Sequence, residues 1–369
     1  MPNGQASPPE QAPTPGGPVA PYEPAVPEGP PEIPPPPAEL IGPRRRRWPR
    51  RRILVLVPLI ALAYILAVVR IPYFVFQPGP AEDVLPLIHV QGQTVYPTKG
   101  HLLLTSISFF QPNVYQAFRA WLDSTQSLVP ERDLLAPGQT QEQEQTRALS
   151  QMDQSKIDAS FVVLMRYAGY PKKHGKGALI EAVEPGAPAD GKLFSGDVIT
   201  AINGKPVTTA AQVGPPIVAA GIGHVVQFTV QSGGKTHTVG IAPARLTGIA
   251  HPAIGISVVD SFPFPLTIDS GSIGGPSAGL MWSLGLTDLL TPGDMTGGRK
   301  IAGTGTIDLN GQVGPIGGIQ EKVVAAERAG AVVFFAPAGE AADARSVAHH
   351  ITVVPVNTYQ DALIYLGQR

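Results

Sequence analysis

Ser277 and Lys322 are the residues of this sequence best suited to nucleophilic chemistry. Ser277 lies in Gly-Gly-Pro-Ser-Ala-Gly, residues 274–279, and residues 278–290 after it are largely apolar and predict a buried helix. Gly275 suits the N-cap and Pro276 the first helical position, so Ser277 falls in the first turn. Backbone N–H groups of that turn can hold an oxyanion, which makes Gly275 and Ala278 candidate supporting residues.

Lys322 lies on a second predicted helix, which Gly317-Gly318 opens and Gly330 closes. The helical period puts Lys322 on an apolar face and Glu321 on the polar face. Burial disfavours a charged ammonium, and a neutral lysine is a general base. A serine at a helix N-terminus beside such a lysine matches the Ser-Lys form of an activated nucleophile.

Each residue also has a plainer interpretation. Ser277 could be an ordinary polar residue of a first helical turn, and the Lys322 ammonium could reach water along a packed stem. The two residues occur together, however, within this pattern of glycines. That combination favours a catalytic Ser277-Lys322 dyad over the two plainer interpretations.

Residues 275–279, 303–307 and 314–322 resemble the proteolytic domain of Lon proteases. The resemblance covers about the last 120 residues. It implies that Ser277 is the nucleophile, that Lys322 is its base, and that Thr304 orients the lysine. It also implies a homo-oligomeric ring, expected to be a hexamer. Many Lon proteins carry an acidic residue just before Gly-Pro-Ser, where this chain has Gly274-Gly275, so the sequence does not support a carboxylate-assisted variant.

Two other serine-hydrolase patterns overlap this region. Residues 275–279 fit the nucleophile elbow G-x-S-x-G, with Asp308 or Asp343 and then His349 in the required order. An elbow needs a strand directly before it, whereas residues 271–275 predict a loop. Residues 269–276 also resemble the trypsin-like G-D-S-G-G-P, but Ser272-Ile273 interrupts that pattern, and the intervening domain leaves no room for the two β-barrels that a trypsin-like enzyme needs.

Residues 1–52 predict a disordered tail that ends in an arginine cluster. Residues 1–43 hold 16 of the 41 prolines and few large apolar side chains, a composition that cannot bury a core. Seven arginines follow within residues 44–52. Arginine runs can contact nucleic acid or lipid head groups. Because an apolar stretch follows directly, lipid is the expected partner, and no nucleic-acid partner is expected.

Residues 53–70 predict one transmembrane helix. Residues 53–69 carry no charge and would extend about 25 Å as a helix, slightly short of a ~30 Å hydrocarbon core. Arg70, Tyr73, Phe74 and Phe76 are expected to extend this reach into the interface. The arginine excess before the span predicts a cytoplasmic N-terminus and an extracytoplasmic body. A cleaved signal peptide is the alternative, but its n-region would be 52 residues long.

Residues 71–160 predict a mixed α/β segment, with strands near 87–90 and 101–107 and a helix over 114–122. The sequence leaves open whether this segment supplies strands to the proteolytic fold. Residues 161–244 resemble a PDZ domain through residues 177–183, 184–189 and 193–204. Such a domain captures extended polypeptides at a sheet edge. Its groove helix is expected to start at Pro215, and no carboxylate-binding loop can be assigned.

Residues 245–369 are expected to form the Lon-like domain. Strands over 331–336 and 351–356 alternate with helices over 341–347 and 359–366, which predicts an α/β (α+β) fold. No Walker A motif occurs, since Thr229 stands where the P-loop before Gly234-Lys235-Thr236 needs glycine. The eight histidines form no H-E-x-x-H and cysteine is absent, so neither a metal nor another cofactor is expected.

Two functions are consistent with the sequence. The first is an ATP-independent, membrane-anchored serine endopeptidase that cleaves exported or membrane-proximal polypeptides and captures them with its PDZ groove. The second is a non-catalytic PDZ scaffold with a degenerate protease fold. The presence of both Ser277 and Lys322 favours the endopeptidase.

Overall fold

The computed structural model describes residues 50–367, with side chains from residue 54 onward. The tail predicted for residues 1–52 lies outside the described residues, apart from the start of helix α1 (Arg50–Val68). Among the described helices, none is long and apolar enough to cross a membrane. The spanning segment therefore remains a prediction.

The aromatic residues after α1 differ from the prediction. Strand β1 (Tyr73–Asp83) begins at Tyr73, and its next side chains point into the protein. Phe74 and Phe76 are buried and pack with Leu135, so they do not extend an apolar surface toward an interface. The two phenylalanines belong to a strand that starts only a few residues after α1 ends.

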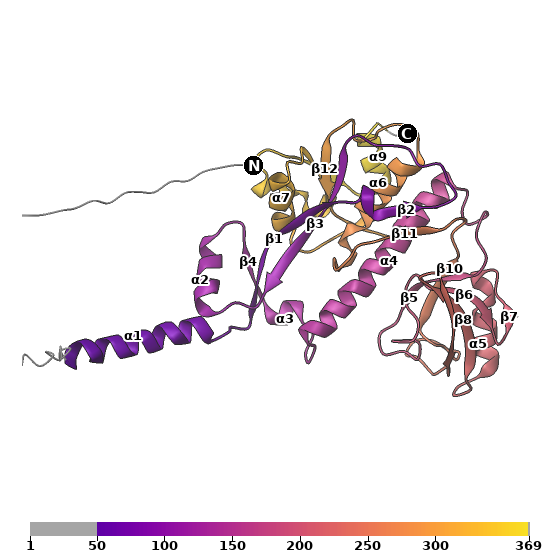
Figure 1. The fold of residues 1–369 in the computed structure, drawn as a ribbon, viewed down its shortest axis with the longest axis horizontal. Helices are drawn as coiled ribbons and strands as arrows, with labels where there is room; N and C mark the ends of the chain where they lie inside the picture. Colours follow the sequence, from indigo (N-terminus) through magenta and orange to yellow (C-terminus); the bar gives the residue numbers. More distant parts are fainter. Residues whose placement is uncertain (1–49, 368–369) are drawn as a thin grey trace, which may run out of the picture. The chain divides into compact units, whose positions relative to one another are not determined.

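A six-stranded sheet forms the centre of the fold, in the order β16-β15-β12-β3-β1-β4. Figure 1 labels β12, β3, β1 and β4 of this sheet. Strands β3, β12, β15 and β16 are parallel, whereas β1 pairs antiparallel with β3 and β4. The strands are β3 (His101–Phe110), β4 (Ser127–Pro130), β12 (Lys300–Gly303), β15 (Val333–Pro337) and β16 (Thr352–Val356). Residues 73–130 thus share one sheet with residues 300–356.

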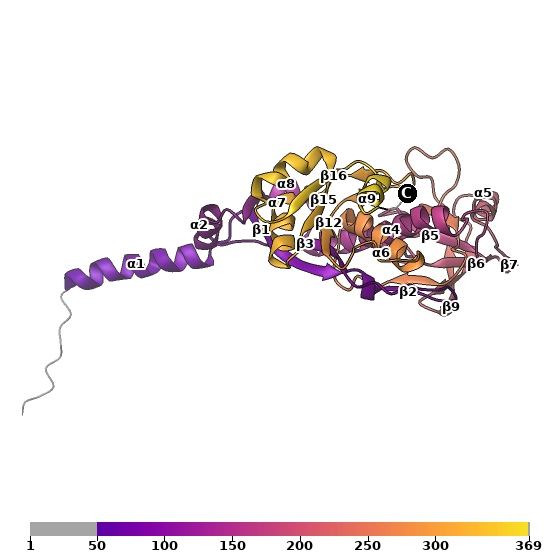
Figure 2. The ribbon, with the colours of Figure 1, turned by 90° about the horizontal axis from the view of Figure 1, so that it is seen from above.

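Helices cover both faces of this sheet. Helices α4 (Gln141–Tyr167), α6 (Gly279–Leu290) and α9 (Tyr359–Tyr365) contribute to one apolar core, which includes the fully buried Trp282. Helices α7 (Ile319–Arg328) and α8 (Ala341–Val347) contribute to a second apolar core (Figure 2). Every residue of β15 is buried, as expected for an interior parallel strand.

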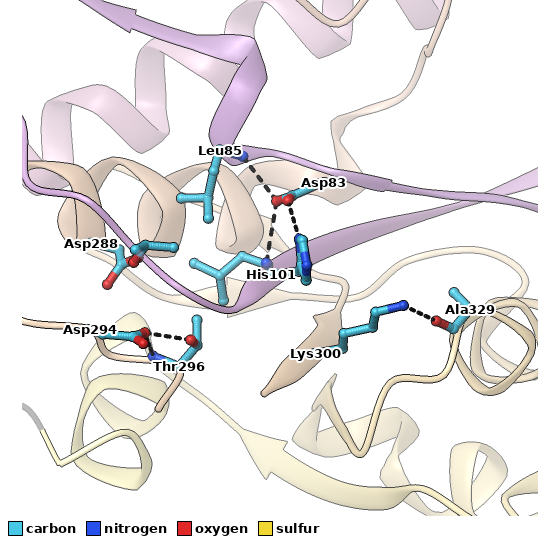
Figure 3. Close-up of polar contacts among 10 residues, drawn as sticks. Asp83, Leu85, His101, Asp288, Asp294, Thr296, Lys300 and Ala329 are labelled. Carbon is cyan, nitrogen blue, oxygen red and sulfur yellow. Dashed lines mark hydrogen bonds and ion pairs between the residues drawn. The ribbon is translucent and has the colours of Figure 1, made fainter. Parts of the chain in front are cut away.

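Polar contacts hold the ends of the central strands. The Asp83 carboxylate accepts hydrogen bonds from the backbone N–H of Leu85 (3.2 Å) and of Leu102 (3.4 Å) and contacts His101 Nδ1 at 2.7 Å (Figure 3). These contacts join the end of β1 to the start of β3. Lys300 donates to the Ala329 carbonyl at 3.2 Å, where a cation complements the C-terminus of α7.

A second sheet is built from the segment between these two groups of strands. Its order is β10-β5-β6-β8-β9, with β7 paired to β6. The strands are β5 (Ala178–Val183), β6 (Val198–Ile202), β7 (Lys205–Pro206), β8 (Val226–Ser232), β9 (Lys235–Ile241) and β10 (Ile256–Asp260). Helix α5 (Gly214–Ala220) contributes Ile217 to the core of this sheet.

The boundaries of this second unit differ from those drawn from the sequence. Helix α4 continues to Tyr167, so residues 161–167 are helical. Strand β10 pairs antiparallel with β5, although it lies beyond residue 244, the predicted end of the PDZ-like segment. Periodicity cannot reveal this pairing, because the two strands are separated by most of the intervening domain.

Strands near 87–90 and 101–107 and the helix over 114–122 occur where they were expected, as β2, β3 and α2.

The elements not yet described are short. The short elements are η1 (Leu85–Leu87), β2 (Ile88–Val90), α2 (Val114–Leu122), α3 (Glu131–Leu134), η2 (Ala210–Gln212), β11 (Leu266–Ile268), η3 (Pro276–Ala278), β13 (Thr306–Ile307), β14 (Val313–Gly314) and η4 (Ala338–Glu340).

Candidate active site

The turn that carries Ser277 is held by helix α4. It is a 3-10 turn, η3, whose N-cap Gly275 has φ 87°, a conformation that favours glycine. The Gly275 N–H donates to the Ala148 carbonyl at 2.7 Å, and the Ser155 hydroxyl donates to the Pro276 carbonyl at 3.0 Å. Because Ala148 and Ser155 both belong to α4, that helix fixes the backbone on which Ser277 lies.

Lys322 points from α7 to this turn. Its side chain is only 3% exposed, and its Nζ donates to Ser277 Oγ at 2.8 Å and to Thr304 Oγ1 at 3.2 Å. The Thr304 hydroxyl donates to the Ser277 carbonyl at 3.0 Å. Three side chains that are far apart in the sequence are thus linked by hydrogen bonds.

The surroundings of Lys322 favour its neutral form. Burial lowers the pKa of Lys322 from 10.5 to about 8, while the carboxylates of Glu340 and Glu321 oppose part of this shift. Desolvation is the larger influence, because the amine is almost completely removed from water. A substantial fraction of this lysine is therefore neutral at slightly alkaline pH.

We expect Lys322→Met to stabilise the fold. A lysine with pKa about 8 when folded and 10.5 when unfolded reduces stability at pH 7, where the folded state must bury a charged ammonium. After allowing for the lost hydrogen bonds, the gain on substitution should be about 1–3 kcal/mol at pH 7. Calorimetry should show a higher melting temperature for the variant.

The gain should shrink as the pH rises from 8 toward 10.5, because the wild-type amine is then increasingly neutral in both states. Lys300→Met is the matched control, since Lys300 is exposed. A Lys322→Met variant with an unchanged or lower melting temperature at pH 7 would show that the buried ammonium is not destabilising.

The other predicted supporting residues lie close to Ser277 but differ in what their backbone can offer. Gly275 has its N–H engaged by Ala148, so it is not free to hold an oxyanion. Ala278 directly follows Ser277 and is buried at the end of η3. Of these two positions, Ala278 is therefore the better candidate for an oxyanion donor.

The rival triad is not assembled. His349 and His350 are exposed, and their backbone N–H groups donate to Glu327. Asp308 accepts hydrogen bonds from N–H groups of its own loop, and Asp343 is exposed. Strand β11 ends at Ile268, so no strand directly precedes Ser277, as a nucleophile elbow requires.

Sequence patterns missed several residues around the site. Glu321 was expected on the polar face of α7, but it is buried, and its carboxylate accepts a hydrogen bond from the Ser127 hydroxyl of β4. Glu340 accepts from the Ile316 N–H at 3.1 Å and lies near Lys322. These contacts join residues that are far apart in the sequence, so no local pattern predicts them. Among the described residues no group of side chains could hold a metal ion.

A second candidate site lies beside the edge strand β10. A cavity of about 420 Å³ is lined by α5, by the end of β5 and by the segment before and along β10. Its lining includes Val183, Ile217, Val218, Gly255 and Ile256. Helix α5 starts one residue before the expected Pro215. Since β10 is an edge strand, its outer backbone groups can pair with an added extended peptide.

Two segments of the chain match known protein families. Residues 266–366 match the Lon protease (S16) C-terminal proteolytic domain, and residues 155–242 match the PDZ domain. The Lon protease of Desulfosudis oleivorans is 47% identical over 77 residues, 19% of this chain and 9% of that protein. Lon protease 1 of Myxococcus xanthus is 27% identical over 218 residues, 56% of this chain and 24% of that protein.

Among solved structures, the PDZ domain of the SdrC-like protein of Listeria innocua is 27% identical. The match covers 22% of this chain and 92% of that chain, with a TM-score of 0.21. The chain spans a quarter or less of the length of the two Lon proteases described above. Two segments of the chain are thus similar to known families, residues 155–242 to the PDZ domain and residues 266–366 to the proteolytic domain of Lon proteases.

Proposed function

We propose that this protein is a serine endopeptidase in which Ser277 is the nucleophile and Lys322 its general base. The observation that carries the proposal is the 2.8 Å contact between Lys322 Nζ and Ser277 Oγ, made by a lysine that burial makes easier to deprotonate. A purely structural lysine would gain nothing from such burial. A non-catalytic scaffold offers no reason for this pairing.

The chemistry follows from this contact. Ser277 Oγ attacks the carbonyl carbon of the scissile peptide bond while its proton passes to the neutral Lys322 Nζ. The resulting ammonium returns that proton to the leaving amine, and the C–N bond breaks to give an acyl-serine. Water then attacks the acyl carbon and gives a proton to Lys322. That proton returns to Ser277 Oγ as the carboxylic acid leaves.

Thr304 and the turn at Ser277 have supporting roles in this proposal. The Thr304 hydroxyl lies between Lys322 Nζ and the Ser277 carbonyl, so it holds the amine in line with the nucleophile. The tetrahedral intermediate carries a negative oxygen, which backbone N–H groups stabilise. We assign that role to the turn around Ala278.

The pH profile of the wild-type protein tests the proposal. Lys322 is active as a base only when neutral, so kcat/KM should rise through a pKa of about 8. Between pH 7 and pH 9 the neutral fraction, and with it kcat/KM on an unstructured peptide, should increase about tenfold. A histidine base would instead give a rise near pH 6.5. A profile that is complete by pH 7 would exclude Lys322.

We further propose that cleavage does not require ATP. Gly234 lies in the turn between β8 and β9, and Lys235 and Thr236 begin β9. This segment is a β-hairpin and not the strand–loop–helix of a P-loop. The preferred substrates are then unstructured or locally open polypeptides. The same unstructured peptide should be cleaved at equal rates with and without ATP.

In this proposal, the PDZ cavity supplies substrate to the proteolytic domain. An extended peptide that pairs with β10 would place apolar side chains against Val218 of α5. Val218→Glu puts a charge in this apolar cavity, so it should raise KM for long peptides several-fold with little change in kcat. Steady-state kinetics on peptides of increasing length would measure the effect.

Ala219→Glu is the matched control, because Ala219 is exposed on the same helix and does not line the cavity. It should leave KM unchanged. Equal kinetics for the two variants would argue against a substrate-capturing role for this cavity.

We infer that residues 53–70 attach the protein to a membrane, with the folded body outside the cytoplasm. Residues 53–69 are uncharged and follow seven arginines. Leu59, Ile60, Leu62, Tyr64 and Ile65 of α1 are each more than half exposed, an apolar surface that favours lipid. By analogy with the Lon resemblance, we also propose a homo-oligomeric ring.

A further inference from the structure

Helix α2 displays a surface that the proposed protease chemistry does not use. Its outward side chains are large and apolar: Tyr115 (58% exposed), Phe118 (56%), Trp121 (71%) and Leu122 (64%). We propose that this face of α2 lies in the interfacial region of a phospholipid bilayer. The proposal rests on the membrane attachment proposed above, and it assigns a second contact with lipid, outside α1.

The pattern of α2 is the reverse of that of an ordinary surface helix. Its buried residues are the small Ala117 and Ala120, while the aromatic residues face outward. A helix that served only to cover the sheet would turn its large apolar side chains inward. The outward face, which follows the helical spacing 115, 118 and 122, needs an apolar partner.

The face is held in a defined orientation. A capping box fixes the start of α2: Asn113 Oδ1 accepts from the Gln116 N–H at 2.8 Å, and Gln116 Oε1 accepts from the Asn113 N–H at 2.9 Å. The helix also contacts strand β4 of the central sheet. Its aromatic side chains therefore project from a supported helix and not from a free loop.

The neighbour of α2 indicates what covers this face. Asn113 Nδ2 donates to the Ala67 carbonyl of α1 at 2.7 Å, and Arg70 Nη1 donates to the Gln111 carbonyl at 2.5 Å. Figure 1 and Figure 2 both show α2 at the end of α1. The exposed aromatic face thus lies beside the helix that carries the exposed apolar surface inferred to enter lipid.

The chemistry of the face fits a bilayer surface better than a second protein. Trp and Tyr rings are enriched at head-group level, where an apolar body and a polar tip are both accommodated. Arg119 is exposed on the same helix and can pair with anionic head groups. A second copy of the chain is the competing occupant, and it predicts burial that depends on protein concentration and not on lipid.

The absence of cysteine from residues 1–369 allows a direct test on this whole chain. A single cysteine is introduced as Phe118→Cys and labelled with an environment-sensitive nitrobenzoxadiazole, and Leu122→Cys provides a second position on the face. Lys235→Cys, exposed at the start of β9, is the control. Each protein is mixed with vesicles of equimolar phosphatidylcholine and phosphatidylglycerol, with a nitroxide quencher placed either at the head group or deep in the acyl chain.

The labels at positions 118 and 122 should brighten several-fold and shift to the blue on vesicle addition, whereas the label at 235 should not. Quenching should be stronger from the shallow nitroxide, because an interfacial helix enters only about 5–10 Å below the head groups. Sedimentation of the vesicles reports attachment of the chain independently of the label.

A chain that sediments with vesicles while its labels at 118 and 122 stay unquenched would overturn the role of α2 and leave the attachment through α1 intact. Brightening that follows protein concentration without lipid would also overturn it, in favour of contact between copies. A chain that does not sediment would refute both membrane proposals without affecting the proposed peptidase activity.

Discussion

Ser277→Ala should lower kcat/KM on unstructured peptides by about 10⁴-fold or more, because the substitution removes the atom that attacks the carbonyl carbon. The variant should stay folded, since the Ser277 side chain is only partly buried. The turn is held by hydrogen bonds from the Gly275 N–H to the Ala148 carbonyl and from the Ser155 hydroxyl to the Pro276 carbonyl, which do not involve that side chain. Peptide hydrolysis followed by mass spectrometry measures the loss, and circular dichroism checks the fold.

Ser272→Ala is the matched control for this variant. Ser272 is exposed in the same loop, five positions before Ser277. Its substitution should leave kcat/KM within about twofold of wild type, as expected for a surface change away from the reacting atoms. Retained hydrolysis by Ser277→Ala would remove Ser277 as the nucleophile, whatever the control shows.

Lys322→Arg should lose activity to a similar degree although it keeps the positive charge. A guanidinium does not deprotonate in proteins, so it cannot accept the proton of Ser277. Lys322→Met should be equally inactive, and its expected gain in stability makes it the variant that separates lost chemistry from lost folding. Steady-state hydrolysis at pH 9, where the wild-type lysine is mostly neutral, gives the largest contrast.

Lys300→Arg provides the matched control, because Lys300 is exposed and its contact with the Ala329 carbonyl is one that an arginine can also make. We expect wild-type kinetics from it. His349→Ala should likewise retain activity, since His349 makes no contact with Ser277 among the described hydrogen bonds. Loss of hydrolysis in His349→Ala together with retention in Lys322→Arg would reinstate a histidine-based triad.

The residues around Ser277 and Lys322 could be predicted because local features mark them. Glycine, proline and an apolar run define a helix start at Ser277, and the helical period of residues 319–329 turns Lys322 inward. Both features depend only on neighbours in the sequence. The structure adds what they could not supply, the 2.8 Å contact between the two side chains.

Tertiary contacts explain what the sequence could not reveal. Glu321 lies on the polar face by periodicity, but it is buried, and Ser127, 194 positions away, donates a hydrogen bond to its carboxylate. Phe74 and Phe76 follow an apolar helix and suggest an interface, yet β3 and β4 pair with their strand and bury them. In each case the deciding partner is distant in the chain.

The division into domains shows the same limit. Residues 73–130 join the sheet of the proteolytic domain, and β10 joins the sheet of β5, because strands pair across a long insertion. By contrast, the alternation of strands and helices after residue 330 is local, and β15, α8, β16 and α9 occur close to the predicted ranges. Local periodicity gives the elements, whereas the order of strands within a sheet depends on long-range packing.

Trapping of an acyl-enzyme is the most direct test of the proposed Ser-Lys mechanism. The wild-type protein is mixed with an activated ester of a short peptide, quenched in acid within the first turnover, digested and analysed by mass spectrometry. We expect the acyl group on Ser277 in the wild type and none in Lys322→Met. An acyl group on a different residue, or equal acylation of Ser277 in Lys322→Met, would contradict the mechanism.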